Sequence, residues 1–441
     1  MSSTIAIVVF GGFILMGFAI EAQGRKKVTP AVWLPLFWMV ICASRSIDQW
    51  LDLSLYNTPL TEAEYLEANL RGSLVDKIVL STAIVWGIII TYKRREAAVG
   101  IFKNNKALLV FIIYLGITVL WSDISDVSFR RWVRLVGSFV MAAVLMTEPE
   151  PLQSVRSVFR RTAYLLIPLS VMLVKYFPQM GILYTMVGEK LWIGVALMKN
   201  GLGFLCFVMA FFLVWDMIST WGRKVEMNYS RVLFDAVVLV MSLWLLRGQE
   251  RAHSSTAIGC LIVGMAILIG SRVPAMKRNF EKIGVLVILV TCVFLVLEST
   301  FGIVEVIVTG MGRNTTFTDR VPLWNTLMDL GLKTPLGGYG YGGFWTAERL
   351  AYIAEKVNFS FNQGHNGYLE IFVEGGLVAI ILLGVLLISV FKKIQRSGLS
   401  DYEYGVFRLS FFAMILLANV TESSFARERD LLTFVFFIIS L

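Results

Sequence analysis

Charged residues are scarce in this chain of 441 residues. Only 16% are Asp, Glu, Lys or Arg, whereas 57% are hydrophobic and the mean hydropathy is +0.72. A water-soluble domain of this length needs a polar surface that such a composition cannot supply. Apolar runs long enough to cross about 30 Å of hydrocarbon recur along the sequence instead. The composition therefore excludes a soluble protein and predicts an all-α protein that crosses a membrane many times.

Cysteine and histidine are also rare, with four and two residues. All the cysteines lie in apolar runs, where small buried side chains are expected rather than disulfides or metal ligands. They are Cys42, Cys206, Cys260 and Cys292. We expect no metal and no cofactor. The net charge of +9 is spread over many loops, so no basic patch for nucleic acid is predicted.

The hydrophobic runs predict twelve or thirteen membrane helices. The first run has no basic residue before it and no small-residue cleavage site after it, so we interpret it as a retained helix with its N-terminus outside. The chain then divides into ten helices within 1–303, a large external loop at 304–370 and the remaining helices within 371–441. The spans are placed at 4–22, 31–43, 74–92, 107–121, 132–147, 162–177, 195–219, 232–247, 255–270, 284–303, 371–390, 406–420 and 431–441.

Basic residues support this topology. Clusters of Lys and Arg occur in alternate loops, as the positive-inside rule requires of cytoplasmic loops. The intervening loops carry less positive charge or are acidic, as at 44–73. The alternation places the 304–370 loop outside the cytoplasm. The clusters are Arg25–Lys27, Lys93–Arg95, Arg156 with Arg160 and Arg161, Arg223–Lys224, Lys277–Arg278 and Lys392–Lys393.

Two arginines of the external loop, Arg313 and Arg320, are candidates for phosphate binding. Guanidinium groups suit phosphate and pyrophosphate because their planar donors bind pairs of oxygens and keep their charge. A short helix that carries Trp324 is expected to follow and to end at Gly331. Two solvated arginines paired with nearby carboxylates are the simpler interpretation. Because a histidine segment follows in the same loop, we favour pyrophosphate for Arg320 and leave both interpretations open for Arg313.

The glycine-rich stretch LGGYGYGGF (Leu336–Phe344) has only a superficial likeness to a phosphate-binding loop. It lacks the Gly-Lys-Ser/Thr ending, follows no strand and faces away from cytoplasmic ATP. We expect glycines that let the backbone pass close to other segments or to a glycan, with Tyr339 and Tyr341 as candidates for stacking on sugars. A flexible turn with interfacial aromatic residues is an equal alternative.

His365 lies just before the next helix, which Asn366 can cap. Glu370 and Glu374 follow on the same helix face as Asn366. An imidazole or carboxylate here could take a proton from a sugar hydroxyl, because both groups titrate near the required range when half-buried. A histidine at a membrane interface would by itself be structural. A carboxylate at the boundary, such as Glu374, is costly and indicates function more strongly.

Three further segments are expected on the outer side. The arginines that follow Trp121–Asp123 break the positive-inside pattern, so they need an anionic partner or contact lipid phosphates at the start of a helix. Lys199–Asn200 interrupts the seventh span, and Arg251 lies between the eighth and ninth. The arginines after Trp121–Asp123 are Arg130, Arg131 and Arg134.

Together these segments resemble the superfamily of bacterial O-antigen ligases and polysaccharide polymerases, and the resemblance covers most of the chain. It is clearest in G-R-x5-D-R-x3-W (Gly312–Trp324), P-L-G-G-Y-G (Pro335–Gly340) and H-N-x-Y-L-E-x3-E-G-G (His365–Gly376). W-S-D (Trp121–Asp123) and K-N-x-L-G (Lys199–Gly203) are similar to the exopolysaccharide-production polymerase branch.

The chain departs from that branch at two positions. Met198 stands where the branch commonly has a histidine before Lys-Asn. The basic residue usual beside the Ser and Thr that open the ninth span is displaced, since His253-Ser254-Ser255-Thr256 stands there, and Arg251 is a candidate substitute. If the branch depends on that histidine, its absence at Met198 weakens the assignment to the branch.

The resemblance implies a GT-C-like glycosyltransferase that crosses the inner membrane of a bacterium many times. Its substrate would be a glycan carried on undecaprenyl pyrophosphate, used at the outer face of that membrane without a cofactor. The implied reaction is polymerisation of lipid-linked repeat units into exopolysaccharide. Membrane lipid, a repeat-unit flippase and a chain-length regulator would be its partners.

For this reaction, arginines would stabilise the departing pyrophosphate and a base would activate the acceptor hydroxyl. His365 is the preferred base or acceptor-orienting group, and Glu370 is the alternative base. The candidates for pyrophosphate are Arg313, Arg320 and Arg251, and those for the glycan are Trp324, Tyr339, Tyr341 and Asn366.

Two rival interpretations stay open. Within the class, a ligase would transfer one glycan from the same carrier to a lipid or protein acceptor. Outside the class, a transporter or lipid flippase would carry charged residues in the middle of several spans. Here the unusual charge concentrates at the outer boundary, and no internal repeat of the kind found in duplicated transporters is evident.

Overall fold

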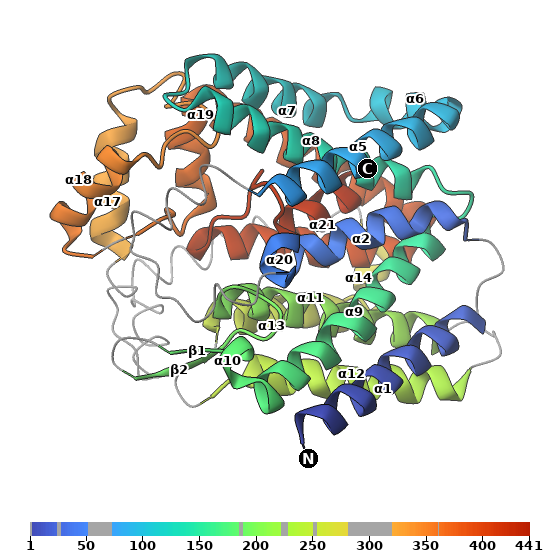
Figure 1. Cartoon of the computed structure of the whole chain (residues 1–441). Coiled ribbons are helices and arrows are strands. Elements are labelled where there is room, and N and C mark those ends of the chain that lie inside the picture. The colour runs from blue at the N-terminus through green and yellow to red at the C-terminus, as the bar shows by residue number, and fades with distance from the viewer. Residues whose placement is uncertain are drawn as a thin grey trace.

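The computed structural model of the chain describes residues 2–23, 28–51, 73–184, 188–221, 228–249, 254–280, 320–359 and 361–441. In these residues the chain forms helices and one antiparallel pair of short strands, β1 (Ile182–Tyr184) and β2 (Lys190–Trp192) (Figure 1). Seven of the described helices are long and apolar enough to cross a membrane. The count is eight if α6 (Arg95–Asn104) and α7 (Lys106–Thr118), which meet at a bend of 83°, form one further span together with the turn after α7. The expected all-α polytopic fold is confirmed.

Each expected span that falls on described residues coincides with a helix. The span at 284–303 lies outside the described residues, as do residues 304–319 of the large loop. Lys199 begins its helix and does not interrupt it, because the preceding buried residues 193–196 form a loop. The remaining span helices are α1 (Ser3–Gln23), α2 (Trp33–Cys42), α5 (Leu74–Lys93), α8 (Ser125–Met146), α9 (Pro151–Tyr176), α11 (Lys199–Trp221), α12 (Tyr229–Arg247), α13 (Ser255–Gly270), α19 (Gly367–Ser400), α20 (Tyr402–Thr421) and α21 (Leu431–Ser440).

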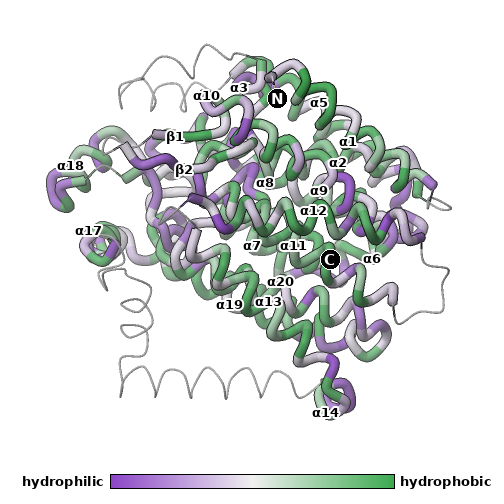
Figure 2. The backbone as a smooth tube through the Cα atoms, turned by 90° about the horizontal axis from the view of Figure 1, so that it is seen from below, coloured by the Kyte–Doolittle hydropathy of each residue, from purple (hydrophilic) through white to green (hydrophobic). Residues whose placement is uncertain are grey.

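Shorter elements connect these helices or cover their outer ends. They are η1 (Pro30–Val32), α3 (Ile47–Leu51), η3 (Val119–Trp121), α10 (Pro178–Gly181), α14 (Pro274–Arg278), α17 (Arg320–Gly331) and α18 (Ala347–Val357). The helix expected to end at Gly331 is therefore confirmed as α17. In Figure 2 the hydrophilic colour gathers around α17, α18 and the β1–β2 hairpin, beyond one end of the apolar helices.

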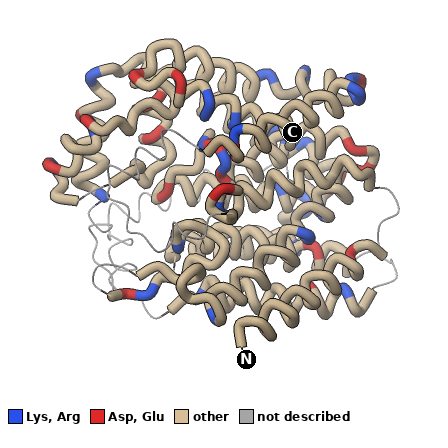
Figure 3. Tube along the Cα trace, viewed as in Figure 1, with Lys and Arg blue, Asp and Glu red and all other residues tan. Residues whose placement is uncertain are grey.

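Four ion pairs near the helix ends each join two residues that the sequence places on the same side of the membrane. In Figure 3 many of the Lys, Arg, Asp and Glu positions lie toward the ends of the helices. Segments expected outside contact one another, and so do segments expected inside, which agrees with the alternation of the loops. The outer pairs are Asp76–Arg429 and Asp123–Arg349, at 2.7 Å each, and the inner pairs are Arg94–Glu148 at 2.6 Å and Arg272–Glu403 at 2.7 Å.

Three arginines that the sequence assigns to a cytoplasmic loop lie inside the helix bundle instead. Their helix, α9, begins at Pro151 and not at 162, so Arg156, Arg160 and Arg161 are helical and only 7%, 6% and 1% exposed. Buried charges are tolerated when they are paired. Carboxylates from α1, α11 and α12 supply the partners and tie four helices together at the inner end. The pairs are Arg161–Glu21 (2.9 Å), Arg156–Asp216 (3.3 Å), Arg160–Asp235 (3.5 Å) and a close Arg160–Asp216 contact.

α19 is broken near its outer end. Gly376 has φ +66° and ψ −166°, so the helix stops there and restarts. At membrane depth, backbone groups freed by such a break need partners within the protein. The glycine-rich stretch provides them by running alongside the break. The bonds are Tyr339 N to Val373 O, Gly340 N to Glu374 O and Leu377 N to Pro335 O, at 2.8 Å each.

Glycines make this close approach possible, as the sequence predicts. A Cβ at Gly338 would lie 2.5 Å from the carbonyl carbon of Glu374. A Cβ at Gly376 would lie 2.2 Å from the carbonyl oxygen of Leu336. Both glycines also have positive φ, which L side chains disfavour. The break and the stretch that covers it therefore form one unit.

A small apolar layer holds α17 and α18 against the N-terminal end of α19. Buried leucines of α17 and Ile353 of α18 pack on Phe344 and on Leu369, the latter in the first turn of α19. The layer fixes the position of the segment that connects α18 to α19. The leucines are Leu323, Leu327 and Leu330.

Replacing Gly376 by alanine should destabilise the protein, because the new Cβ meets a carbonyl oxygen at 2.2 Å and the positive φ is strained. We expect the free energy of unfolding to fall by at least about 2 kcal/mol. Gly384→Ala is the matched control in the same helix, since nothing lies within 4 Å of its Cβ position. Thermal unfolding of both variants in detergent measures the difference, and equal midpoints would contradict a constrained break.

Candidate active site

His365 lies in the short segment between α18 and α19 and has a left-handed backbone, with φ +47°. Such a conformation costs a non-glycine residue about 1–3 kcal/mol and persists only where neighbours fix it. Trp324 Nε1 donates to the carbonyl of Gly364 at 2.9 Å on one side. On the other side, Asn366 N donates to Ser423 Oγ at 3.2 Å. The backbone is thus held on both sides of His365.

Asn366 caps α19, as the sequence predicts. Its Oδ1 accepts hydrogen bonds from Tyr368 N at 3.1 Å and Leu369 N at 3.0 Å. These bonds satisfy two of the free N–H groups at the helix start. Since the side-chain oxygen is used in this way, the cap fixes where α19 begins relative to His365. The predicted glycan contact of Asn366 stays a prediction.

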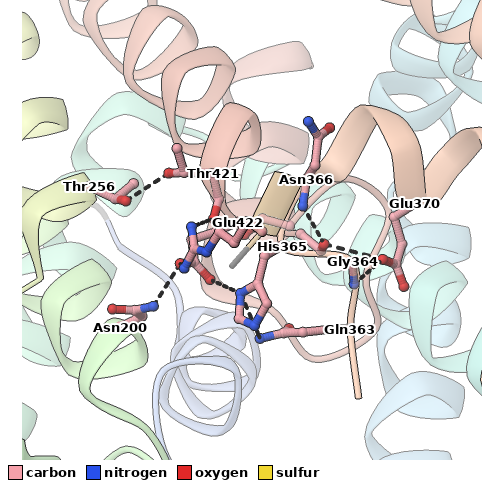
Figure 4. Close-up of polar contacts among 12 residues, drawn as sticks. Asn200, Thr256, Gln363, Gly364, His365, Asn366, Glu370, Thr421 and Glu422 are labelled. Carbon is pink, nitrogen blue, oxygen red and sulfur yellow. Dashed lines mark hydrogen bonds and ion pairs between the residues drawn. The ribbon is translucent and has the colours of Figure 1, made fainter. Parts of the chain in front are cut away.

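The imidazole of His365 faces a buried carboxylate from a distant part of the chain, Glu422, which is only 4% exposed. His365 Nδ1 lies 3.2 Å from Glu422 Oε2. Arg320 Nη2 lies 2.9 Å from Oε1 of the same carboxylate. Asn200 Nδ2 donates to that Oε1 at 2.7 Å (Figure 4). One carboxylate therefore joins the start of α11, the start of α17, the segment before α19 and the segment after α20.

The pKa of Glu422 reflects these partners. Burial raises it, but the hydrogen bond and charge of His365 and the charge and hydrogen bond of Arg320 outweigh burial, so the pKa lies below its usual range. An ionised carboxylate only accepts hydrogen bonds. A neutral His365 must then carry its proton on Nδ1, which leaves a lone pair on Nε2. That nitrogen, which lies 3.5 Å from the amide nitrogen of Gln363, is the atom that can take a proton from a hydroxyl once the substrate displaces this contact.

Arg320 is the first residue of α17, and 17% of its side chain is exposed. Besides the carboxylate of Glu422, it contacts the carbonyl oxygen of Thr421. The arginine and the histidine thus meet at opposite oxygens of one carboxylate. The other two pyrophosphate candidates, Arg313 and Arg251, lie outside the described residues.

Glu370 does not approach the histidine as a free base. Its Oε2 accepts hydrogen bonds from Gly364 N at 2.8 Å and Ser423 Oγ at 3.3 Å. Its Oε1 accepts a hydrogen bond from Trp345 Nε1. Both oxygens are therefore occupied by groups that shape the histidine segment. The geometry favours a positioning role for Glu370.

The aromatic candidates divide by exposure. Trp324 and Tyr339 are partly buried at the edge of the apolar layer beneath the site. Tyr341 is 2% exposed, and its hydroxyl donates to the carbonyl of Ala426 at 2.5 Å. A buried ring offers no face on which a sugar could stack in this conformation. Tyr341 instead links the glycine-rich stretch to the segment after α20.

The segment between α20 and α21 supplies the groups that sequence reasoning missed. It contributes Glu422 and Ser423 to the site, and both contact residues around position 365. A signal was available: five charged residues crowd between two apolar runs on the side expected outside. They are Glu422, Arg427, Glu428, Arg429 and Asp430.

The two earlier outer segments also reach this region. Asn200 contacts Glu422 directly. Trp121 Nε1 donates to the carbonyl of Gly337 at 3.2 Å, and Asp123 pairs with Arg349 of α18. The Lys199–Asn200 segment therefore belongs to the carboxylate cluster. The Trp121–Asp123 segment supports the glycine-rich stretch and α18 instead.

Chemically, the cluster combines a proton acceptor of defined tautomer with a guanidinium group 2.9 Å from the carboxylate that orients the acceptor. A base beside a fixed positive charge suits attack by a hydroxyl on a centre whose leaving group is an anion.

Two comparisons with known proteins show similarity to membrane proteins of polysaccharide production. A family profile described as O-antigen ligase matches residues 227–384, which include Arg320 and His365 but end before Glu422. Over 326 residues the chain is 24% identical to the exopolysaccharide production protein ExoQ of Rhizobium meliloti (strain 1021). That match covers 71% of this chain and 70% of the relative.

Glu422 should make the stability of the protein depend on pH. Since its pKa is lowered in the folded state, its stabilising contribution is complete above the ordinary value of 4.5 and is lost as the pH falls through the lowered value. We expect the difference in melting temperature between the wild type and Glu422→Gln to narrow as the pH falls below about 4.5. Thermal unfolding in detergent at several pH values measures it.

Glu403→Gln is the control for this measurement. Glu403 pairs with Arg272 at the inner end, where the side chains are 22% and 37% exposed, and such surface pairs contribute little. A pH-dependent difference as large for Glu403→Gln as for Glu422→Gln would contradict the assignment to Glu422.

Proposed function

Because the chain belongs to the superfamily of O-antigen ligases and polysaccharide polymerases, we propose that it polymerises lipid-linked oligosaccharide repeat units into an exopolysaccharide. The observation that carries this proposal is the carboxylate of Glu422, shared by His365 and Arg320. It brings a candidate base and a candidate anion-binding group together on the side expected to face away from the cytoplasm.

The donor in this proposal is a glycan on undecaprenyl pyrophosphate. Outside the cytoplasm no ATP is available, so the energy of the new glycosidic bond must arrive within the donor. Pyrophosphate meets this need because it is a good leaving group. The lipid part also keeps the donor in the inner membrane, in reach of an enzyme with many membrane helices.

In the proposed step, Nε2 of His365 takes the proton of the acceptor hydroxyl while the hydroxyl oxygen bonds to the anomeric carbon of the donor. The bond between that carbon and the pyrophosphate oxygen breaks, and its electron pair leaves with the pyrophosphate. Arg320 stabilises the charge that develops on this leaving group. Glu422 stabilises the imidazolium that forms. The products are the extended glycan and undecaprenyl pyrophosphate, and His365 returns its proton to water.

Arg313 and Arg251 are assigned to the same pyrophosphate as further candidates. Glu370 is assigned to positioning, since its oxygens bind Gly364, Ser423 and Trp345. Trp324 and Tyr339 remain the candidates for glycan contact because both keep some exposed surface.

Polymerisation is favoured over ligation by two observations. The relative reported above is an exopolysaccharide production protein. The Lys199–Asn200 segment, on which the likeness to the exopolysaccharide branch rests, contributes Asn200 to the carboxylate cluster. A flippase that delivers repeat units and a regulator of chain length are the expected partners of such a polymerase.

The product distinguishes these activities. Purified protein, reconstituted into vesicles with the host's undecaprenyl-pyrophosphate repeat units as the sole substrate, should yield a ladder of repeats on a gel. An intact donor that is consumed only after a lipid or protein acceptor is added would identify a ligase. A donor that stays intact under all conditions would overturn the enzyme proposal and favour a transporter.

The same assay tests the assigned roles. His365→Ala should lower kcat by about 10²–10⁴-fold, the usual contribution of a general base. Arg320→Ala should lose most turnover at limiting donor, because the leaving group is no longer stabilised. Glu370→Gln should keep turnover within about tenfold, since the amide oxygen still accepts hydrogen bonds. Near-normal rates in His365→Ala, or a loss in Glu370→Gln as large as in His365→Ala, would reverse the assignment of the base.

A further inference from the structure

A second group of arginines lies at the outer end of the bundle, apart from the carboxylate cluster. Two of them, Arg131 and Arg134, are one turn apart on α8 and so share a helix face. A third, Arg429, comes from the segment between α20 and α21. Two carboxylates accompany them, since Glu428 pairs with Arg131 at 3.4 Å and Asp76 pairs with Arg429 at 2.7 Å.

Arg134 differs from the other two. Within the described part of the chain, its guanidinium makes no hydrogen bond or ion pair, although it interacts electrostatically with the other arginines and both carboxylates. It is partly buried and lies about 14 Å along α8 from Ser125, at 1.5 Å per residue. Arg134 lies near the outer end of the span expected at 132–147, where a guanidinium group can reach an anionic head group.

Chain geometry connects this group to the reaction centre. The segment that carries Glu422 at its start carries Arg429 seven residues later, so the two backbones are at most about 25 Å apart. Arg427, between them, donates to Oε1 of Gln363. The amide nitrogen of Gln363 lies 3.5 Å from Nε2 of His365, the ring nitrogen that can accept its hydrogen bond. A ligand on the arginine group would therefore lie on the same side of the bundle as the candidate base, at a distance that an oligosaccharide repeat of several sugars can span.

We propose that Arg134, with Arg131 and Arg429, binds the pyrophosphate head group of the accepting substrate. This proposal rests on the proposed polymerase function, in which both reactants are lipid-linked and two anionic head groups must be held at once. Arg320 binds the pyrophosphate of the donor, which is released in the reaction. The second arginine group binds the pyrophosphate of the acceptor, which remains attached to the extended glycan. Guanidinium forks suit pyrophosphate oxygens in both places.

The charge balance of the second group suits that role. Glu428 and Asp76 already neutralise part of the positive charge of Arg131 and Arg429. The three arginines and two carboxylates leave a net positive charge, which attracts an anion. The guanidinium of Arg134 makes no hydrogen bond or ion pair to the described residues, so its donors are available to a ligand. Arg131 and Arg429 add positive charge around it.

Two synthetic substrates separate donor from acceptor. A donor-only repeat has its accepting hydroxyl methylated. An accept-only repeat has a methylene phosphonate in place of the anomeric oxygen and cannot give up its glycan. Together they form a single product, a capped dimer on the accept-only lipid. Its rate of formation gives a KM for each partner.

Arg134→Gln should raise the KM of the accept-only repeat by about tenfold or more, the scale of a lost charge-assisted hydrogen bond, and leave kcat and the donor KM within about twofold. Arg134→Lys should raise the acceptor KM less, because the lysine keeps the positive charge but cannot donate two parallel hydrogen bonds. This variant replaces Arg134→Gln in the experiment if the glutamine variant does not fold. Arg272→Gln, which removes an arginine from the inner end, is the matched control and should change neither KM.

A third substrate identifies the bound group. An accept-only saccharide on a neutral alkyl chain lacks pyrophosphate, so wild type and Arg134→Gln should use it with the same, raised KM. An equal effect of the substitution on this neutral acceptor would overturn the proposal in favour of a glycan contact. An unchanged KM for every substrate would overturn it in favour of a phospholipid contact. A wild-type protein that forms no capped dimer would instead overturn the polymerase function itself.

Discussion

One buried carboxylate organises the outer half of this protein. A carboxylate 4% exposed is tolerated only with compensating partners, and Glu422 takes three, from α11, α17 and the segment before α19. The hydrogen bonds and ion pairs that stabilise this buried carboxylate place a histidine and an arginine next to each other. Its charge sets the histidine tautomer, so the electrostatic cost of burying Glu422 and the chemistry available to His365 have the same origin.

The position of that carboxylate cluster depends on the broken helix beside it. α19 breaks at Gly376, and the backbone groups left open are bonded by the glycine-rich stretch. Tyr341 of this stretch in turn bonds to Ala426 and so connects the stretch to the segment that carries Glu422. Glu370 completes the connection, because it binds both Gly364 and Ser423. Backbone hydrogen bonds that a membrane protein must satisfy internally thereby hold the site in place.

The two ends of the bundle use charge differently. At the inner end, buried arginines of α9 are matched by carboxylates of three other helices, and the pairs hold the helices together. At the outer end, arginines share carboxylates or, in the case of Arg134 within the described residues, have no direct partner. Matched charges suit structure, whereas incompletely matched positive charges suit the recognition of anions.

Local properties of the sequence determined the membrane helices, the alternation of their ends, the cap at Asn366 and the candidates Arg320 and His365. Hydropathy, charge and capping act over a few residues, so they can be read along the chain. Only the tertiary structure decided that Glu422 joins those candidates, that Glu370 is occupied by structural donors, that Tyr341 is buried and that the arginines of α9 lie inside the bundle. Each of these depends on a partner from a distant segment, and the pairing of buried polar groups is settled by packing in three dimensions.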